Sequence, residues 1–133
     1  MFLLDTSVLT RLRDPSVLRR VEELDAAGLA RASMTDLEIG YSARNAEEWD
    51  RLMAALDAFG RVDVQAHHFD RARQVQRQLA AGGLKGRKVP DLLVAAVAEA
   101  SSLTVLHYDV DFDHISAVTG QATEWVVERG SVD

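Results

Sequence analysis

Short apolar segments that alternate with segments of helical length are the feature that most limits what this chain can fold into. The apolar runs that suit strands are residues 2–4, 29–33, 61–64, 103–106 and 123–127. Strands that alternate with helices predict an α/β fold. We therefore expect a central, mainly parallel β-sheet of about five strands, flanked by helices.

Ordinary capping residues mark the boundaries of the helices. Asp14 and Pro15 predict the start of a helix that ends near Gly28. Thr35 predicts the start of another. The remaining segments with helical periodicity are 47–59, 68–81 and 91–100, the last of them apolar almost all round and hence expected to be buried. At the end of the chain, we expect residues 131–133 to fray.

Size and composition narrow the class of protein. A chain of 133 residues is short enough for one domain over residues 1–133, and 47% hydrophobic residues can build its core. The sequence has no cysteine, which excludes disulfides, thiolate zinc sites and a cysteine nucleophile and favours a cytoplasmic location. Asp5 interrupts the first apolar stretch too early for a signal peptide, and no apolar run is long enough to cross a membrane.

Net charge limits how the protein can bind nucleic acid. The formal charge is −6, which is the wrong sign for a protein that holds nucleic acid over its whole surface. Any such contact must be local. The one basic loop, residues 83–90, contains Lys85, Arg87 and Lys88. These side chains either contact phosphate or form a solvated loop.

Acidic residues occur where the predicted strands end. Asp5 and Asp109 directly follow apolar strands, and Glu38 and Asp91 lie near the starts of helices. In open α/β sheets, ligands bind at the carboxyl ends of the strands. Four separate segments are therefore expected to bring acids to one edge of the sheet.

Each acid also has a purely structural interpretation. Asp5 and Asp91 can cap the helices that follow them. Glu38 can complete a capping box with Thr35, three residues earlier. Asp109 can form a turn between a strand and a helix. The individual positions leave capping and function open, whereas their convergence favours a common ligand.

The segment 109–113 places three alternating aspartates at a strand end. Like charges brought together cost free energy unless something neutralises them. Mg²⁺ and Mn²⁺ bind carboxylate oxygens, and nuclease sites use such ions to activate water and hold phosphate. A divalent cation would explain why the acids converge.

Four motifs together resemble the PIN-domain family, and in particular its VapC-like toxins from toxin–antitoxin pairs. They are LLDTSVL, TDLEIGYSAR, VPDLLVAAVA and LHYDVDFDHI, in that order over nearly the whole chain. By this resemblance Asp5, Glu38, Asp91 and Asp109 form the catalytic acidic quartet, and Asp111 is a further acid of the site. The resemblance implies Mg²⁺- or Mn²⁺-dependent endonucleolytic cleavage of RNA and a cognate antitoxin protein as partner.

The resemblance also implies a role for each site residue. The expected metal ligands are Asp5, Asp91, Asp109 and Asp111. Glu38 would orient or deprotonate water, and Thr6 would order the ligands through its hydroxyl. Family members commonly carry Thr or Ser where this chain has His107, so a hydroxyl is either missing here or supplied by Thr6.

Other functions and surfaces remain open at this stage. A haloacid-dehalogenase-like phosphatase also places an Asp after its first strand, but it needs a second acid where this chain has Ser7. A non-catalytic interaction module, with the acids as caps, is the other alternative. We expect a homodimer, and the apolar faces of helices 15–27 and 47–59 either bind a partner peptide or a second copy, or face the core.

Overall fold

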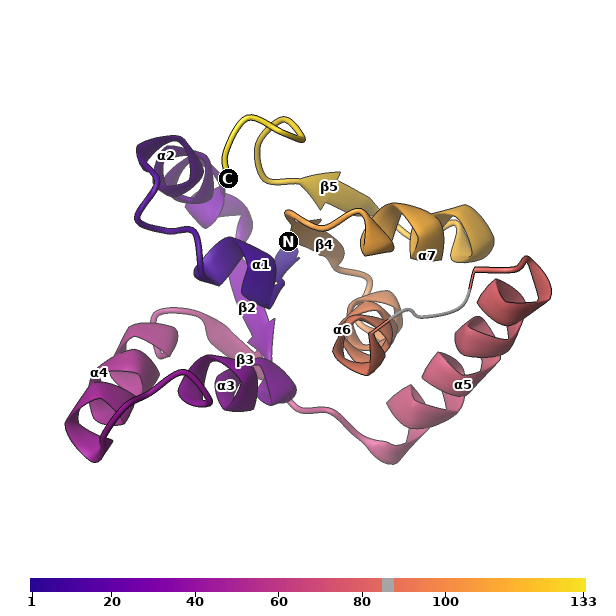
Figure 1. Ribbon diagram of the computed structural model, residues 1–133, viewed down its shortest axis with the longest axis horizontal. Helices are drawn as coiled ribbons and strands as arrows, with labels where there is room; N and C mark the ends of the chain where they lie inside the picture. Colours follow the sequence, from indigo (N-terminus) through magenta and orange to yellow (C-terminus); the bar gives the residue numbers. More distant parts are fainter. Residues whose placement is uncertain (85–87) are drawn as a thin grey trace.

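A parallel sheet forms the centre of the fold in the computed structural model, which describes residues 1–84 and 88–133 (Figure 1). Its five strands within these ranges lie in the order β3-β2-β1-β4-β5, and all four pairings are parallel. The strands are β1 (Phe2–Leu4), β2 (Leu29–Ala32), β3 (Gly60–Val62), β4 (Thr104–His107) and β5 (Thr123–Trp125). The predicted α/β class with a mainly parallel sheet is confirmed.

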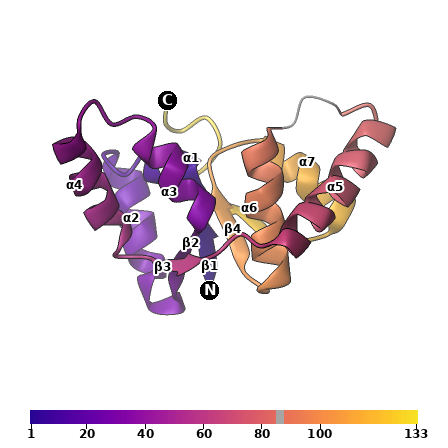
Figure 2. The ribbon, with the colours of Figure 1, turned by 90° about the horizontal axis from the view of Figure 1, so that it is seen from below.

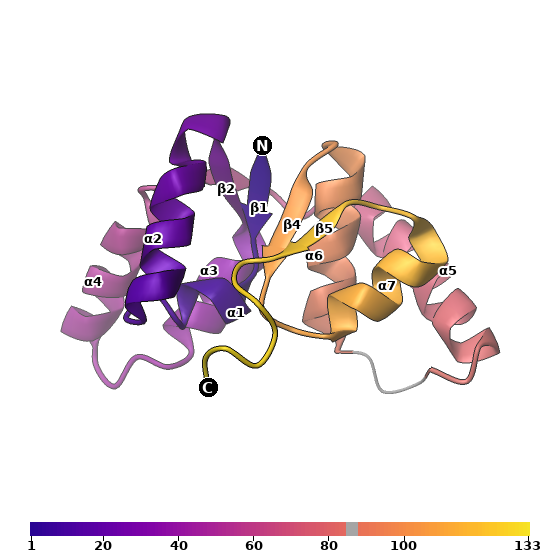
Figure 3. The same cartoon turned by 90° about the horizontal axis from the view of Figure 1, so that it is seen from above.

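Helices cover both faces of the sheet. They are α1 (Thr6–Leu9), α2 (Pro15–Leu24), α3 (Ser33–Gly40), α4 (Ala46–Leu56), α5 (Ala66–Ala81), α6 (Val89–Ala100) and α7 (Asp111–Thr119), with a 3₁₀ turn η1 (Asp25–Ala27) after α2. Figures 1 and 3 show α5, α6 and α7 together on one side of the sheet and α2 on the other. In Figure 2, α3 lies beside α4.

Alternation along the central strands divides the core in two. Leu3 of β1 packs among side chains of α5, α6 and α7, whereas Leu4 packs with Val17 and Val21 of α2. Successive side chains of a strand point to opposite faces of a sheet. Both core clusters therefore meet at β1, and this strand has no freedom to shift its register without exposing one of them.

Helix α6 is buried along most of its length. Residues 91–98 are all buried, as the apolar sequence predicts. The helix begins at Val89 rather than at residue 91, because Pro90 lacks the N–H that a first helical turn leaves unused anyway. A helix packed on this scale is a rigid support for whatever its first turn carries.

Several boundaries differ from the predicted ones by one to three residues. Helix α3 starts at Ser33 and not at Thr35, because β2 runs directly into it without a loop. The Ser33 hydroxyl accepts a hydrogen bond from the Val64 backbone N–H. Helix α5 starts at Ala66 because the His68 imidazole accepts a hydrogen bond from the Gln65 backbone N–H. A side chain that acts as a cap explains the second shift, and the direct passage from β2 into the helix explains the first.

The predicted fraying of residues 131–133 is not what the structure shows. The Tyr108 hydroxyl donates to the Val132 carbonyl oxygen at 2.7 Å. The same hydroxyl accepts hydrogen bonds from the backbone N–H groups of Gly130 and Val132. One half-buried tyrosine thus anchors the end of the chain. Among the described helices, none is both long and apolar enough to span a bilayer.

Candidate active site

A pocket of about 250 Å³ lies at the carboxyl ends of β1 and β4. In Figure 3 these strands run downward, and α1 and the starts of α6 and α7 lie at their lower ends. The described residues that line the pocket are Asp5, Thr6, Ser7, Thr10, Arg11, Glu38, Lys88, Asp91, Tyr108 and Asp109. All four acids of the expected quartet are therefore in one place, together with Thr6 and Lys88.

Asp5 both caps a helix and lines the pocket. Its Oδ2 accepts hydrogen bonds from the Ser7 backbone N–H at 3.0 Å and from the Ser7 hydroxyl at 2.6 Å. Its own N–H donates to the Leu106 carbonyl oxygen of β4. The carboxylate is only 4% exposed, and this burial raises its pKa despite the hydrogen bonds from Ser7, which act in the opposite direction. The structural and functional interpretations are thus compatible at this position.

Glu38 does not form the capping box that its spacing from Thr35 suggested. Thr35 lies inside α3, whose N-cap is Ala32, so the geometry of a capping box is absent. The Glu38 carboxylate instead accepts a hydrogen bond from the Thr6 hydroxyl at 2.8 Å. Burial raises the pKa of Glu38, and the nearby Asp5 charge acts in the same direction. Thr6 therefore supplies a hydroxyl to the site, through Glu38.

Asp91 is the acid with the least protein support. It is the third residue of α6, whose N-cap is Lys88, and its side chain makes no capping hydrogen bond to the residues that the structure describes. Within the described ranges its Oδ2 is buried and has no hydrogen-bond partner. Burial, followed by repulsion from Asp5 and Asp109, raises its pKa to about 8. A buried carboxylate oxygen without a partner is costly unless a ligand occupies it.

Asp109 has the opposite electrostatic environment. Its Oδ1 accepts from the Asp111 backbone N–H at 2.9 Å, and the Lys88 ammonium lies 3.0 Å from its Oδ2. Burial acts to raise the pKa of Asp109, but these two contacts lower it overall. The same contact with Asp109 raises the pKa of Lys88. Asp109 is therefore ionised, whereas Asp91 is readily protonated.

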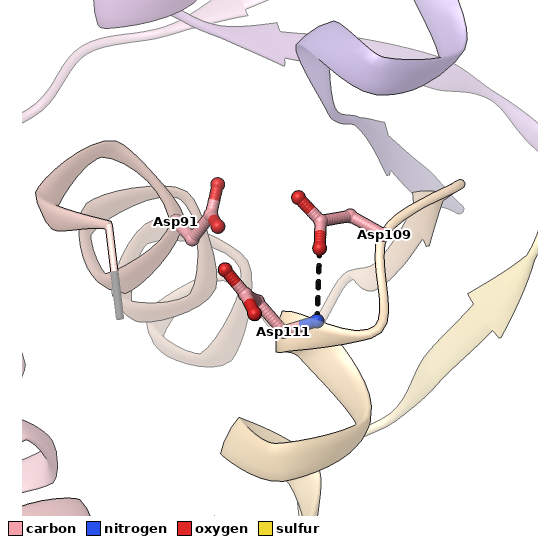
Figure 4. A group of neighbouring side chains, drawn as sticks. All are labelled: Asp91, Asp109 and Asp111. Atoms are coloured by element: carbon pink, nitrogen blue, oxygen red, sulfur yellow. Dashed lines mark hydrogen bonds between the residues drawn. The ribbon is translucent and has the colours of Figure 1, made fainter. Parts of the chain in front are cut away.

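The three aspartates Asp91, Asp109 and Asp111 fit a hard divalent cation. Each offers a carboxylate oxygen, and these oxygens lie within 4.8 Å of one another (Figure 4). Oxygen ligands are those that Mg²⁺ and Mn²⁺ prefer. Together with the partnerless Asp91 oxygen, this donor set fits the expected ion. Asp113 takes no part, because its carboxylate accepts from the Trp125 indole N–H.

His107, at the position where the resemblance led us to expect a hydroxyl, is buried two residues before Asp109. Its ring is fully buried, 5.0 Å from the rings of Phe112 and Trp125. Its Nδ1 accepts a hydrogen bond from the Asp109 backbone N–H at 3.2 Å. Burial lowers its pKa to about 4, so the imidazole is neutral at pH 7. His107 therefore fixes the turn that carries Asp109, without adding charge.

Some pocket residues were not found from the sequence, and some predicted ones cannot be placed. Ser7 is in the first motif and Arg11 lies two residues beyond it, one helical turn after Ser7, but the sequence pattern gave neither of them a role in the site. Tyr108 immediately precedes an expected site acid, which was the available signal. The predicted phosphate contacts Lys85 and Arg87 lie outside the described residues.

The raised pKa of Asp91 predicts how stability of the metal-free protein depends on pH. A raised pKa stabilises the fold below the unfolded-state value, and this contribution is lost as pH rises through about 8. The lowered pKa of His107 acts oppositely, but only below about pH 6.5. Between about pH 6.5 and 8 the melting temperature in EDTA should therefore fall, and Asp91→Asn should flatten this decline.

The matched control for this measurement is Asp14→Asn. Asp14 is an exposed helix cap whose pKa is lowered by its hydrogen bonds with Ser16, so its contribution is lost only in acid. This variant should keep the wild-type decline between pH 6.5 and 8. Parallel curves for wild type and Asp91→Asn would show that Asp91 is an ordinary carboxylate.

Comparisons with known proteins agree with this geometry. The sequence matches the PIN domain family over residues 2–118. The chain is 56% identical to Ribonuclease VapC51 of Mycobacterium tuberculosis over 99% of its length and 97% of the relative. It is 43% identical to Ribonuclease VapC18 of the same organism, over 99% of both chains.

Solved structures share the fold at lower sequence identity. The crystal structure of VapBC2 from Rickettsia felis bound to a promoter DNA fragment gives a TM-score of 0.78 at 21% identity, covering 92% of this chain and 96% of that one. The structure of VapBC-1 from nontypeable Haemophilus influenzae also gives 0.78, at 17% identity, over 96% and 98% of the two chains. The fold, the sequence match and the high identity to its relatives show that this chain belongs to the PIN-domain family and, within it, to the VapC group.

Proposed function

We propose that this protein is an Mg²⁺- or Mn²⁺-dependent endoribonuclease that hydrolyses RNA and acts as the toxin of a toxin–antitoxin pair. The observation that carries the proposal is the pocket in which four chain segments bring acids together around the partnerless Asp91 oxygen. The names of the relatives, Ribonuclease VapC51 and VapC18, support the same activity.

In this proposal the cation is held by Asp91, Asp109 and Asp111, with Asp5 as a further ligand from the neighbouring strand end. A bound divalent cation would supply Lewis acidity and make a water molecule more acidic. The protein's part is to hold the carboxylates in position. Ser7 fixes the Asp5 carboxylate, and the Asp111 backbone N–H fixes that of Asp109.

Glu38 is the residue we assign to accept the proton of the attacking water. Its carboxylate lines the pocket, and the Thr6 hydroxyl holds one of its two oxygens at 2.8 Å. The other oxygen is then oriented for a water. Burial raises the pKa of Glu38, which makes it a better proton acceptor than a solvated carboxylate.

An acidic pocket needs nearby cations if it is to hold a polyanion. Lys88 is the described residue of the basic loop that reaches the acids, through its ion pair with Asp109. Its side chain is 62% exposed, so it can reorient toward a phosphate. We keep Lys85 and Arg87 as proposed RNA contacts on the grounds of their charge.

The two alternatives lose support at particular residues. Ser7 occupies the position where a haloacid-dehalogenase-like phosphatase needs its second acid, and it is engaged in holding Asp5. A protein whose acids served only as caps would use Glu38 and Asp91 for capping, and neither of them does so. The arrangement therefore favours a hydrolytic site over both.

An antitoxin partner and a homodimer complete the proposal. The similar structures contain VapBC complexes, in which a VapC protein occurs with VapB. On this chain Leu37, Tyr41, Trp49 and Phe69 are large apolar side chains with 76%, 92%, 47% and 51% of their surface exposed. Exposed apolar surface of this kind marks protein contacts. On α2, in contrast, Val17, Val21 and Leu24 face the core, and Leu18 is exposed. We also propose a cytoplasmic location, because the RNA that such a toxin would cleave lies there.

Asp5→Asn is the sharpest test of the catalytic proposal. Asn can still accept the Ser7 hydrogen bonds and cap α1, so the fold should be retained. The loss of one ligand charge should reduce RNA cleavage by at least about a hundredfold. Cleavage is measured with purified protein, single-stranded RNA and added Mg²⁺ or Mn²⁺, with EDTA abolishing it.

The chain offers a matched control for this substitution. Asp14 caps α2 by the same pair of hydrogen bonds, from the backbone and the hydroxyl of Ser16, but far from the pocket. Asp14→Asn should cleave like wild type. The proposal fails if Asp5→Asn cleaves as well as Asp14→Asn, or if wild type is fully active in EDTA.

Expression in a bacterial host tests the toxin assignment. Induction of the wild-type chain alone should arrest growth, because uncontrolled RNA cleavage stops protein synthesis. The Asp5→Asn variant should leave growth normal, and co-expression of the product of the adjacent gene should restore growth to cells that make the wild type. Normal growth despite high levels of cleavage-competent protein would contradict a toxin role while leaving the nuclease intact.

A further inference from the structure

Arg11 and Tyr108 are pocket residues to which the proposed hydrolysis assigns no role. Arg11 follows α1, and Tyr108 lies between β4 and Asp109; both line the pocket together with the acids. Arg11 brings a permanent positive charge to a pocket that is otherwise strongly acidic. The question is what this cation binds.

The guanidinium of Arg11 is held in a defined position. Its Nη1 donates to the Ser7 carbonyl oxygen at 2.8 Å, one helical turn earlier. Its Cζ lies 4.8 Å from the centroid of the Tyr108 ring, so the cation rests against the aromatic ring. The Tyr108 ring is in turn fixed by an edge contact with Trp125, at 5.4 Å between centroids. Arg11 is thus preorganised before any ligand binds.

The same contacts tie Arg11 to the acids. The Tyr108 backbone N–H donates to the Ser7 hydroxyl oxygen at 2.9 Å. That hydroxyl donates to Asp5 Oδ2 at 2.6 Å. Because Tyr108 directly precedes Asp109, the position of Arg11 is fixed relative to acids on two different strands. A ligand bound by Arg11 would be placed in a definite register with the hydrolytic site.

The contacts of Arg11 with an acid are long. Its Nε donates to the Asp133 backbone oxygen at 3.4 Å and lies 3.9 Å from the Asp133 carboxylate, and the Asp133 side chain is 98% exposed. Exposed pairs of this kind are weak and readily replaced. By comparison, Arg71 is held by both oxygens of Glu99, at 2.6 and 3.1 Å. An arriving phosphate would therefore displace Asp133 at little cost.

We propose that Arg11 binds the RNA phosphate adjacent to the scissile one and so sets the register of the strand in the pocket. This rests on the proposed RNA cleavage. Lys88 serves the reacting phosphate beside Asp109, whereas Arg11 offers the neighbouring phosphate the guanidinium donors that Ser7 does not use. Arg11 is a substrate-binding residue, and Tyr108 is the residue that positions it.

The test compares Arg11→Gln with Arg13→Gln. Both remove one positive charge, but Arg13 is exposed in the turn after α1 and is not among the described residues that line the pocket. Binding of a short single-stranded RNA that wild type cleaves is measured in the Asp5→Asn background over a range of salt. Arg11→Gln should weaken binding about tenfold and reduce the salt slope by about 0.7. Arg13→Gln should change neither.

A second measurement identifies the phosphate. Each phosphate of the RNA is replaced in turn by a neutral methylphosphonate. One replacement, at the phosphate next to the scissile position, should weaken the binding of RNA to the Arg13→Gln control. The same replacement should not weaken binding to Arg11→Gln any further, because the methylphosphonate and the substitution remove the same contact. In the cleaving protein, Arg11→Gln should raise KM and leave kcat nearly unchanged.

The outcomes separate this proposal from the one it rests on. If wild type cleaves RNA, yet Arg11→Gln binds with the control's affinity, salt slope and pattern of phosphate losses, the assignment of Arg11 is wrong and the nuclease stands. If wild type neither binds nor cleaves RNA, both proposals fail. Unchanged melting temperature of Arg11→Gln, relative to Arg13→Gln, shows that lost binding is not lost folding.

Discussion

Several carboxylates repel one another at the C-terminal ends of the strands, and the surrounding structure has to hold them together against this repulsion. Asp5 and Asp91 are almost completely buried, and the pKa of Asp91 is raised to about 8 by burial and by its acidic neighbours. Such a cluster persists only if rigid elements hold it. The buried helix α6 and the strand β1, which is packed on both faces, supply that rigidity. Two deeply packed elements of the fold, β1 and α6, therefore position the buried acids that repel one another.

Local caps and the site use the same side chains. Asp5 and Asp14 cap their helices with the same pair of hydrogen bonds, each from a serine two residues later. One cap is exposed on the surface, and the other opens into the acidic pocket. The difference lies in burial and neighbours, since burial raises the pKa of Asp5 whereas the hydrogen bonds of Ser16 lower that of Asp14. The two aspartates share a capping motif, so it is their position in the fold that decides which of them belongs to the acidic site.

The sequence predicted where the site acids meet, because topology alone sends the ends of parallel strands to one edge. It did not predict which partner each side chain takes. The spacing of Glu38 from Thr35 suggested a capping box, but the carboxylate pairs with Thr6, which lies on another segment. The tail beyond β5 was expected to fray, yet Tyr108 holds it. Side-chain pairs distant in sequence depend on exact packing, which periodicity and spacing do not encode. Arg11 was overlooked for the same reason, since its contact with Tyr108 joins two separate segments.

The central claim, that these carboxylates form a divalent-cation site, is tested most directly by thermal unfolding with titrated Mg²⁺ at constant ionic strength. A ligand that binds only the folded state at 100 times its dissociation constant stabilises it by about 2.7 kcal/mol, which raises the melting temperature of wild type by several degrees. The melts are recorded above about pH 8, where Asp91 is ionised, so that Asp91→Asn removes one repelling charge at the partnerless oxygen. In EDTA it should therefore melt no earlier than wild type, and it should lose most of the shift that Mg²⁺ causes. An Asp91→Asn protein that melts earlier in EDTA and retains the full Mg²⁺ shift would contradict the account.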